Sequence, residues 1–158
     1  MSETFAEVYT DGSCHTQRKT GVWVAIIFIG NEKKVLSAIV TDTTHNRMEL
    51  TAVIKSIQYL KTHYRLITTI RIFTDSQYVT GFPGRKEKIT SSDFNTQKGN
   101  PLQNADLVKT FLLLLSSISI EFIKIKAHQK QTDTINYNRE ADKLSRKLLR
   151  KAVDQNID

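Results

Sequence analysis

The chain has 158 residues, and its hydrophobic fraction of 39% and charged fraction of 25% are typical of a globular protein and exclude a disordered chain. No apolar run is long enough to cross a bilayer, no signal or transit peptide is visible, and a single cysteine excludes an intramolecular disulfide and a cysteine-rich zinc site. The formal net charge of +7 favours a polyanionic partner such as nucleic acid, although scattered surface lysines alone would give the same total.

Alternating and helically spaced apolar residues predict the elements in chain order. Three strands come first, over residues 5–11, 21–29 and 35–40, and a helix follows from a cap at Thr43 or Thr44 to about Tyr64. A fourth strand over residues 67–74 leads into a short helix that starts at 75–76 and then into an irregular segment, 81–101. The last elements are a helix over residues 102–115, a strand over 119–126, a polar loop over 130–136 and a helix over 137–153.

This order indicates an α/β fold. Turns join the three leading strands, which therefore pair antiparallel, whereas helices precede the two later strands, which therefore run parallel. We expect a five-stranded mixed sheet with helices on both faces and with Trp23 in its core. Since no repeat or linker divides the chain, we expect one cytoplasmic domain over residues 1–158, with an ordered core from about 4 to 153 and no contact with a membrane.

Four acidic residues, each in a distinct local string, are the candidate functional groups, and each also has an ordinary explanation. Asp11 belongs to a tight-turn signal at a predicted strand end. Asp75 suits the N-cap of the helix that it precedes, and Glu49 lies near the start of its helix, where the helix dipole favours an acid. Asp142 can form a surface ion pair with Arg146, one helical turn later.

Taken together, the acids favour a metal site. Glu49 lies at the edge of the apolar stripe that faces the sheet, and Asp11 and Asp75 follow neighbouring strands, where α/β sheets commonly build ligand sites. Carboxylates that lie close together repel one another unless cations neutralise them. Oxygen ligands of this kind suit Mg²⁺, so the pattern predicts two Mg²⁺ ions beside a phosphodiester.

Five short strings around these acids resemble the signatures of type 1 ribonuclease H. In order they are YTDGSC at residues 9–14, TTHNRMEL at 43–50, TDSQYV at 74–79, IKAHQ at 125–129 and NREAD at 138–142. The resemblance covers the whole chain, and its second string is highly specific. It implies the ribonuclease H-like fold and a monomer that cleaves the RNA strand of an RNA–DNA hybrid to 5′-phosphate and 3′-hydroxyl ends. It also implies two Mg²⁺ ions, for which Mn²⁺ can substitute.

The resemblance assigns a role to each acid by motif position. Asp11 would bridge the two ions, and Glu49 would hold the ion at the leaving oxygen. Asp75 and Asp142 would help to hold the ion that activates the attacking water. Glu140 is the alternative to Asp142, because extra residues precede this string and leave its register open.

The resemblance further implies a surface that recognises the sugars of the hybrid, since a sequence-neutral nuclease identifies RNA by its 2′-hydroxyl groups. His45 would also line this groove, and His128 would assist proton transfer or product release. Thr44 would bind a phosphate of the DNA strand at a helix N-terminus, in addition to capping the helix. The residues that the family pattern places along the minor groove are Gly12, Ser13, Cys14, Gln17, Asn46, Glu49 and Gln77.

The chain departs from the family pattern in two loops. Residues 15–20 replace a glycine-rich stretch, and no tryptophan-bearing protrusion occurs between Val79 and Ala105. The second loop would instead contact the hybrid through basic residues, so that binding there is mainly electrostatic and sensitive to salt; a solvated loop is the alternative. These basic residues are Arg85, Lys86, Lys88 and Lys98. Two other functions stay open, a non-catalytic hybrid-binding module and a DNA nuclease of the same fold.

Overall fold

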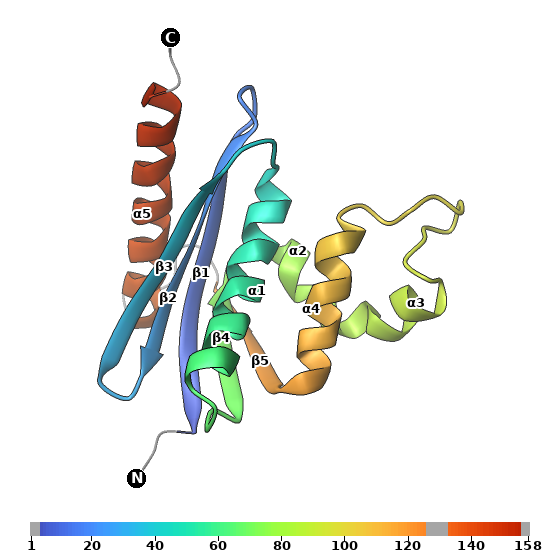
Figure 1. Ribbon diagram of the computed structural model, residues 1–158, viewed down its shortest axis with the longest axis horizontal. Helices are drawn as coiled ribbons and strands as arrows, with labels where there is room; N and C mark the ends of the chain where they lie inside the picture. The colour runs from blue at the N-terminus through green and yellow to red at the C-terminus, as the bar shows by residue number, and fades with distance from the viewer. Residues whose placement is uncertain (1–3, 126–132, 156–158) are drawn as a thin grey trace.

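Five strands form one mixed sheet in the order β3-β2-β1-β4-β5 in a computed structural model that describes residues 4–125 and 133–155 (Figure 1). The strands are β1 (Phe5–His15), β2 (Thr20–Ile29), β3 (Glu32–Val40), β4 (Thr69–Thr74) and β5 (Ser119–Lys124). The first three pair antiparallel, whereas β4 lies parallel to both β1 and β5. The predicted mixed sheet is therefore confirmed.

Helices cover both faces of this sheet, as predicted (Figure 1). On one face, α1 (His45–His63) and α4 (Ala105–Ser117) pack on a core that includes Val8 and Trp23. On the other face, α5 (Asp133–Gln155) packs on Tyr9 and Val24. Successive residues of a strand point to opposite faces, so β1 and β2 contribute to both cores. No helix in residues 4–125 and 133–155 is long and apolar enough to span a membrane.

The β1–β2 hairpin is longer than predicted. The expected end of the first strand at Asp11-Gly12 is wrong, because β1 continues to His15 and stays paired with β2 as far as Thr20. The extension contains polar residues such as Ser13 and therefore shows no apolar pattern in the sequence. It can still pair as a strand, because backbone hydrogen bonds between strands do not require apolar side chains. The turn is thus confined to residues 16–19, where Lys19 adopts a positive φ of 52°.

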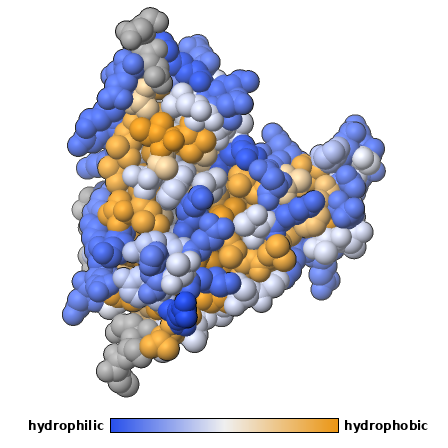
Figure 2. All heavy atoms as spheres, viewed as in Figure 1, coloured by the Kyte–Doolittle hydropathy of each residue, from blue (hydrophilic) through white to orange (hydrophobic). Residues whose placement is uncertain are grey.

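The segment 81–101 is not wholly irregular, and this expectation is also wrong. After α2 (Gln77–Thr80), a short 3₁₀ helix η1 (Pro83–Arg85) leads into α3 (Lys86–Ser91). Phe82 and Ile89 are buried in the main core and anchor the segment. On the face shown in Figure 2, the outer end of this segment is mostly hydrophilic, and apolar atoms gather where it joins the rest of the molecule.

Helix α5 begins at Asp133, four residues before the predicted start, so residues 133–136 are helical and not part of a polar loop. Residues 126–132, which include His128, lie outside the described residues. The other helices agree with their predicted positions within a few residues, and Thr44 is the N-cap of α1 because its side chain accepts a hydrogen bond from the Arg47 backbone amide.

Candidate metal centre

Asp11 lies within β1, opposite Val24 of β2, and is only 8% exposed. The parallel pairing of β1 with β4 ends at the Tyr9–Phe73 pair, before Asp11 is reached. Beyond this pair, one edge of β1 faces the residues that follow β4. Asp11 is therefore accessible to neighbouring acids because the β1–β4 pairing ends before it, and not because β1 itself ends there.

Glu49 comes from α1, on the opposite face of the sheet from α5, and is 3% exposed. Helix α1 can approach β1 this closely because residue 12 is glycine. A Cβ atom at Gly12 would lie 2.6 Å from the Glu49 backbone nitrogen and 2.7 Å from the carbonyl carbon of Met48. The Asp11-Gly12 pair has the sequence signature of a tight turn, but its glycine instead allows α1 to pack close to β1 beside Asp11.

Asp75 follows the last residue of β4 and leaves the sheet next to Asp11. The expectation that Asp75 suits the N-cap of the next helix is wrong, because Ser76 occupies that position. The Ser76 hydroxyl oxygen accepts a hydrogen bond from the Val79 backbone amide at 3.2 Å. The Asp75 carboxylate is therefore not used as a cap, and it is exposed to solvent.

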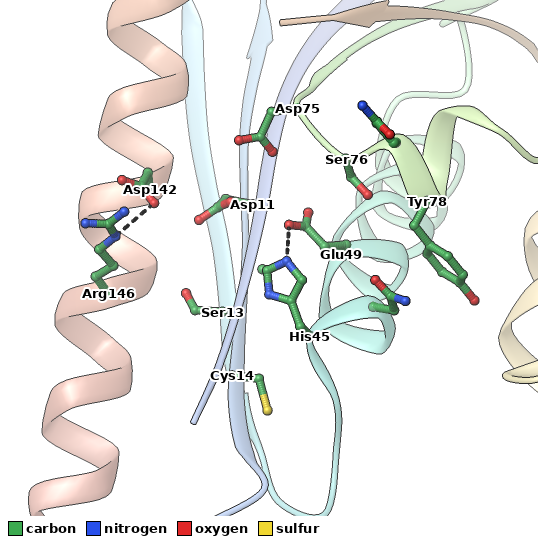
Figure 3. A pocket seen from close by; sticks show the side chains of 13 residues that line it. Asp11, Ser13, Cys14, His45, Glu49, Asp75, Ser76, Tyr78, Asp142 and Arg146 are labelled. Atoms are coloured by element: carbon green, nitrogen blue, oxygen red, sulfur yellow. Dashed lines mark hydrogen bonds and ion pairs between the residues drawn. The ribbon is translucent and has the colours of Figure 1, made fainter. Parts of the chain in front are cut away.

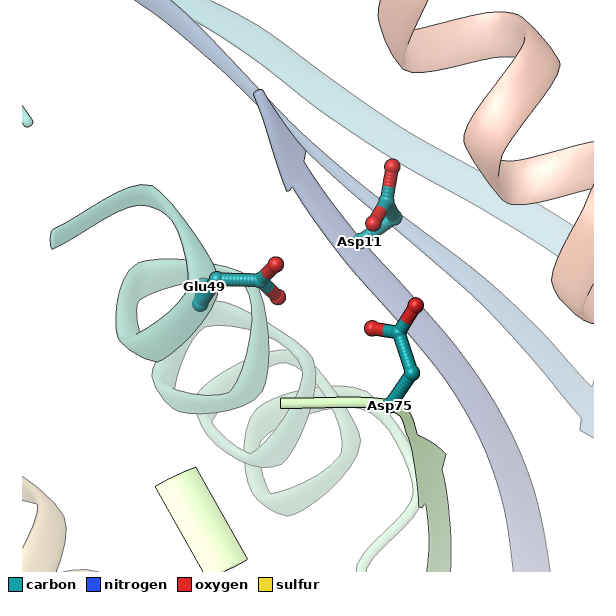
Figure 4. Close-up of side chains that lie close together, drawn as sticks. All are labelled: Asp11, Glu49 and Asp75. Atoms are coloured by element: carbon teal, nitrogen blue, oxygen red, sulfur yellow. The ribbon is translucent and has the colours of Figure 1, made fainter. Parts of the chain in front are cut away.

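These three acids meet at one point (Figure 4). One carboxylate oxygen from each of Asp11, Glu49 and Asp75 lies within 4.8 Å of the other two. The three side chains come from a strand, a helix and the end of a second strand, so only the folded chain brings them together. Carboxylate oxygens at this spacing suit a hard divalent cation such as Mg²⁺.

The electrostatics of the cluster favour a cation. The pKa of Asp11 is raised to about 7, chiefly by burial and to a smaller extent by the charges of Glu49, Asp75 and Asp142, against a hydrogen bond from Ser145 that lowers it. Burial likewise raises the pKa of Glu49, against its hydrogen bond with His45. Without a cation, the cluster is therefore ionised only at a free-energy cost, and a cation bound there removes that cost.

One oxygen of Glu49 has a partner and the other does not. His45 Nε2 lies 3.2 Å from Glu49 Oε1, and this contact raises the pKa of the imidazole (Figure 3). Among the described residues, the buried Oε2 atom of Glu49 has no hydrogen-bond partner. A buried carboxylate oxygen without a partner is costly, and a cation ligated by Oε2 would satisfy it. The donor set therefore fits a metal ion.

Asp142 lines the same pocket from α5, but it is not one of the three clustered acids (Figure 3). Its Oδ1 atom accepts a hydrogen bond from Arg146 Nε at 3.1 Å, as the spacing of one helical turn suggests. Glu140, the alternative fourth acid, forms an ion pair with Lys33 of β3 at 2.8 Å and does not line the pocket. Of the two, Asp142 is the one positioned beside the cluster.

Ser145 belongs to the site but was not singled out from the sequence. It is fully buried, and its hydroxyl lies 2.6 Å from Asp11 Oδ2. The available signal was helical phase, since Ser145 lies four residues after the buried Ala141 and is a polar residue within the stripe that faces the sheet. The pocket also contains two residues without a predicted role, Ser76 and Tyr78.

The predicted hybrid-contacting residues divide into two groups. Those that line the pocket are Gly12, Ser13, Cys14, His45, Asn46, Glu49 and Gln77. Those that do not line it are Gln17, Thr44, Arg85, Lys86, Lys88 and Lys98. Gln17 lies in the β1–β2 turn, and Lys86 Nζ forms a hydrogen bond with Ser116 Oγ of α4. The basic residues thus belong to a region separate from the acids.

Comparison with known proteins agrees with this arrangement. The family model described as RNase H matches residues 3–150. A ribonuclease H of Thermoanaerobacter sp. (strain X514) is 31% identical over 152 residues, which is 95% of this chain and 93% of the relative. A ribonuclease H of Chlorobium luteolum is 32% identical over 91% of this chain and 94% of its own length. A ribonuclease H of a Wolbachia of Drosophila simulans is 33% identical over 94% of this chain and 98% of its own length. With this coverage, and with the sheet order and acidic cluster described above, the chain belongs to the ribonuclease H family.

Proposed function

We propose that this protein is an endonuclease that hydrolyses the RNA strand of an RNA–DNA hybrid and leaves 5′-phosphate and 3′-hydroxyl ends. The observation that carries the proposal is the convergence of Asp11, Glu49 and Asp75 in a pocket built from the strings that resemble ribonuclease H. The relatives that match nearly the whole chain are named ribonuclease H. We further propose that the protein acts as a cytoplasmic monomer.

The acids would hold two Mg²⁺ ions, for which Mn²⁺ can substitute. Asp11, the more buried of the two aspartates in the cluster, would contact both ions, while Glu49 reaches them from α1 and Asp75 from the end of β4. Asp142 would complete the ligand set if its carboxylate released Arg146 and bound a cation instead. When bound, the ions supply a hydroxide-like nucleophile and neutralise the charge that develops on the leaving oxygen.

The rest of the pocket offers groups that suit a sugar–phosphate strand. Ser13, Asn46 and Gln77 carry hydroxyl and amide groups that can exchange hydrogen bonds with a 2′-hydroxyl, which is both donor and acceptor. Cys14 lies beside Ser13 on β1. Because hydrogen bonds to the sugar do not depend on which base is attached, these groups would distinguish RNA from DNA without a preference for a nucleotide sequence. Thr44, at the N-terminus of α1, would bind a phosphate of the DNA strand.

A cleavage assay with end-labelled RNA–DNA hybrid, duplex DNA and duplex RNA tests the proposal. We expect cleavage of the hybrid alone, in Mg²⁺ and not in EDTA, and the labelled ends identify the products. The Asp11→Asn variant should bind the hybrid but should not cleave it. Cleavage of duplex DNA without cleavage of the hybrid would indicate a DNA nuclease of the same fold, and binding of the hybrid without cleavage would indicate a binding module.

A further inference from the structure

The hydroxyl of Ser145 joins α5 to β1 at the acidic cluster. Ser145 is fully buried, and its Oγ atom lies 2.6 Å from Asp11 Oδ2 and 2.8 Å from Ser13 Oγ. It also lies 3.0 Å from the backbone carbonyl oxygen of Asp142, one turn earlier in α5. A single hydroxyl thus contacts two acidic residues of the pocket and a serine that lines it.

The direction of these hydrogen bonds follows from the chemistry of the groups. An ionised carboxylate only accepts hydrogen bonds, and a hydroxyl has a single proton to donate. Ser145 therefore donates to Asp11 and accepts from Ser13, which gives a chain from β1 to α5 and back to β1. A hydrogen bond to an ionised acceptor is short and strong, and each bond of such a chain polarises the next.

This chain fixes one side of the Asp11 carboxylate. Oδ2 is held by Ser145, and no hydrogen bond to Oδ1 is found in the described part of the chain. Asp11 points to the face of the sheet that α5 covers, like Tyr9 two residues earlier, whereas Glu49 reaches the cluster from the helix on the other face. The orientation of this carboxylate therefore decides whether it can share a cation with Glu49 and Asp75.

We propose that Ser145 is a positioning residue of the metal centre, which holds the Asp11 carboxylate in the orientation that the divalent cation requires and anchors the turn of α5 that carries Asp142. The inference rests on the proposed function, since it concerns the same site. Residues that hold a ligand carboxylate in place commonly change metal affinity about 10- to 100-fold when they are removed.

The test is the affinity of the protein for Mn²⁺ and Mg²⁺ without hybrid, measured by calorimetry on wild type, Ser145→Ala and Ser56→Ala. Ser56 is a matched control, because it is also fully buried in a helix and its hydroxyl donates to the Val53 carbonyl oxygen of its own helix at 2.8 Å. We expect Ser145→Ala to weaken Mn²⁺ binding about tenfold and Ser56→Ala to leave it unchanged. In cleavage assays, Ser145→Ala should raise the Mg²⁺ concentration for half-maximal rate and leave KM for the hybrid unchanged.

Thermal unfolding in EDTA shows whether each variant is folded. If Ser145→Ala does not fold, Ser145→Cys, which is close in size and is a weaker donor, should bind Mn²⁺ less tightly than wild type. Equal Mn²⁺ affinity of wild type and the folded Ser145 variant would overturn the inference. Failure of the wild type itself to bind Mn²⁺ or to cleave hybrid would instead overturn the proposed function, so the two failures are distinguishable.

Discussion

Gly12 and Glu49 lie backbone against backbone, so that a Cβ atom at residue 12 would come within 2.6 Å of the Glu49 nitrogen. The atoms that it would meet belong to the main chain of α1 or to the base of a side chain, and none of them is the flexible end of a side chain. The contact sets the distance between β1 and α1, and therefore between Asp11 and Glu49. One glycine thus determines how closely two acids of the cluster approach each other.

The first prediction is that Gly12→Ala destabilises the fold and impairs the site. The added methyl group must push α1 away from β1, which we expect to lower the free energy of unfolding by about 1–3 kcal/mol. Urea unfolding and Mg²⁺-dependent cleavage of hybrid measure the two effects. Gly84→Ala is the control, because a Cβ atom at Gly84 would meet no atom within 4 Å and the stability should change by less than about 1 kcal/mol. Equal stability of both variants would contradict the prediction.

The second prediction concerns the pH dependence of the metal-free protein. The pKa of Asp11 is about 7 in the folded state and 3.8 as an ordinary aspartate. Because the pKa of Asp11 is raised in the folded state, the contribution of this group to the free energy of unfolding is fully present below pH 3.8. It is lost as the pH rises through 7, by at most about 4 kcal/mol. In EDTA, Asp11→Asn should therefore lose less stability than wild type between about pH 5 and pH 8. Urea unfolding across this range measures the loss, and parallel curves for the two proteins would contradict it.

The strand order and the pairing directions could be predicted from the sequence because they follow from connection lengths. Short turns join β1, β2 and β3, and the helices α1 and α4 precede β4 and β5. The boundaries were less predictable. Ser13 and His15 are polar residues of a strand, and their pairing with Val22 and Thr20 is a backbone interaction that leaves no apolar pattern.

For the candidate site, the local strings were sufficient to single out Asp11, Glu49 and Asp75, since each of these acids lies in a string that resembles a ribonuclease H signature. The sequence favoured Asp142 and kept Glu140 as the alternative because the register of this string was open, and the rotation of α5 relative to the sheet is what separates the two acids in the structure. The same rotation determines that Ser145 faces Asp11. A helix that packs on a sheet has its phase set by packing along its whole length, and a local string does not contain that information.

The third prediction separates these two acids. Asp142→Asn should reduce cleavage at least 100-fold at a given Mg²⁺ concentration, because it removes a proposed ligand, an effect on the order of that found for catalytic groups. Glu140→Gln should leave cleavage unchanged, since Glu140 pairs with Lys33 on the surface. Single-turnover cleavage of a labelled hybrid measures both variants. A large loss in Glu140→Gln and none in Asp142→Asn would assign the fourth ligand to Glu140.

The fourth prediction concerns the link between α1 and α4. Arg47 binds both carboxylate oxygens of Asp106, at 2.9 and 2.8 Å, and this pair lowers the pKa of Asp106 to about 2. A lowered folded pKa means that the stabilisation is present above pH 3.8 and is lost as the pH falls through 2. Because Asp106 is 66% exposed, water screens the pair, and we expect Asp106→Asn to cost only about 1 kcal/mol at neutral pH. Urea unfolding should show this difference at about pH 7 and a clearly smaller one near pH 2; a constant difference would refute the assignment.

The last prediction concerns the basic segment around η1 and α3. Arg85 and Lys88 are exposed cations of this segment that can reach phosphates, whereas Lys86 is half-buried and forms a hydrogen bond with Ser116 of α4. If each neutralises one phosphate of the hybrid, the double variant Arg85→Ala/Lys88→Ala should weaken binding and reduce the salt slope of the logarithm of affinity by about 2. Binding of a hybrid by the cleavage-deficient Asp11→Asn protein, titrated with salt, measures this slope. Lys34→Ala/Lys55→Ala removes the same charge from β3 and the middle of α1 and should leave the slope nearly unchanged. Equal slopes for the two double variants would mean that the segment is a solvated surface.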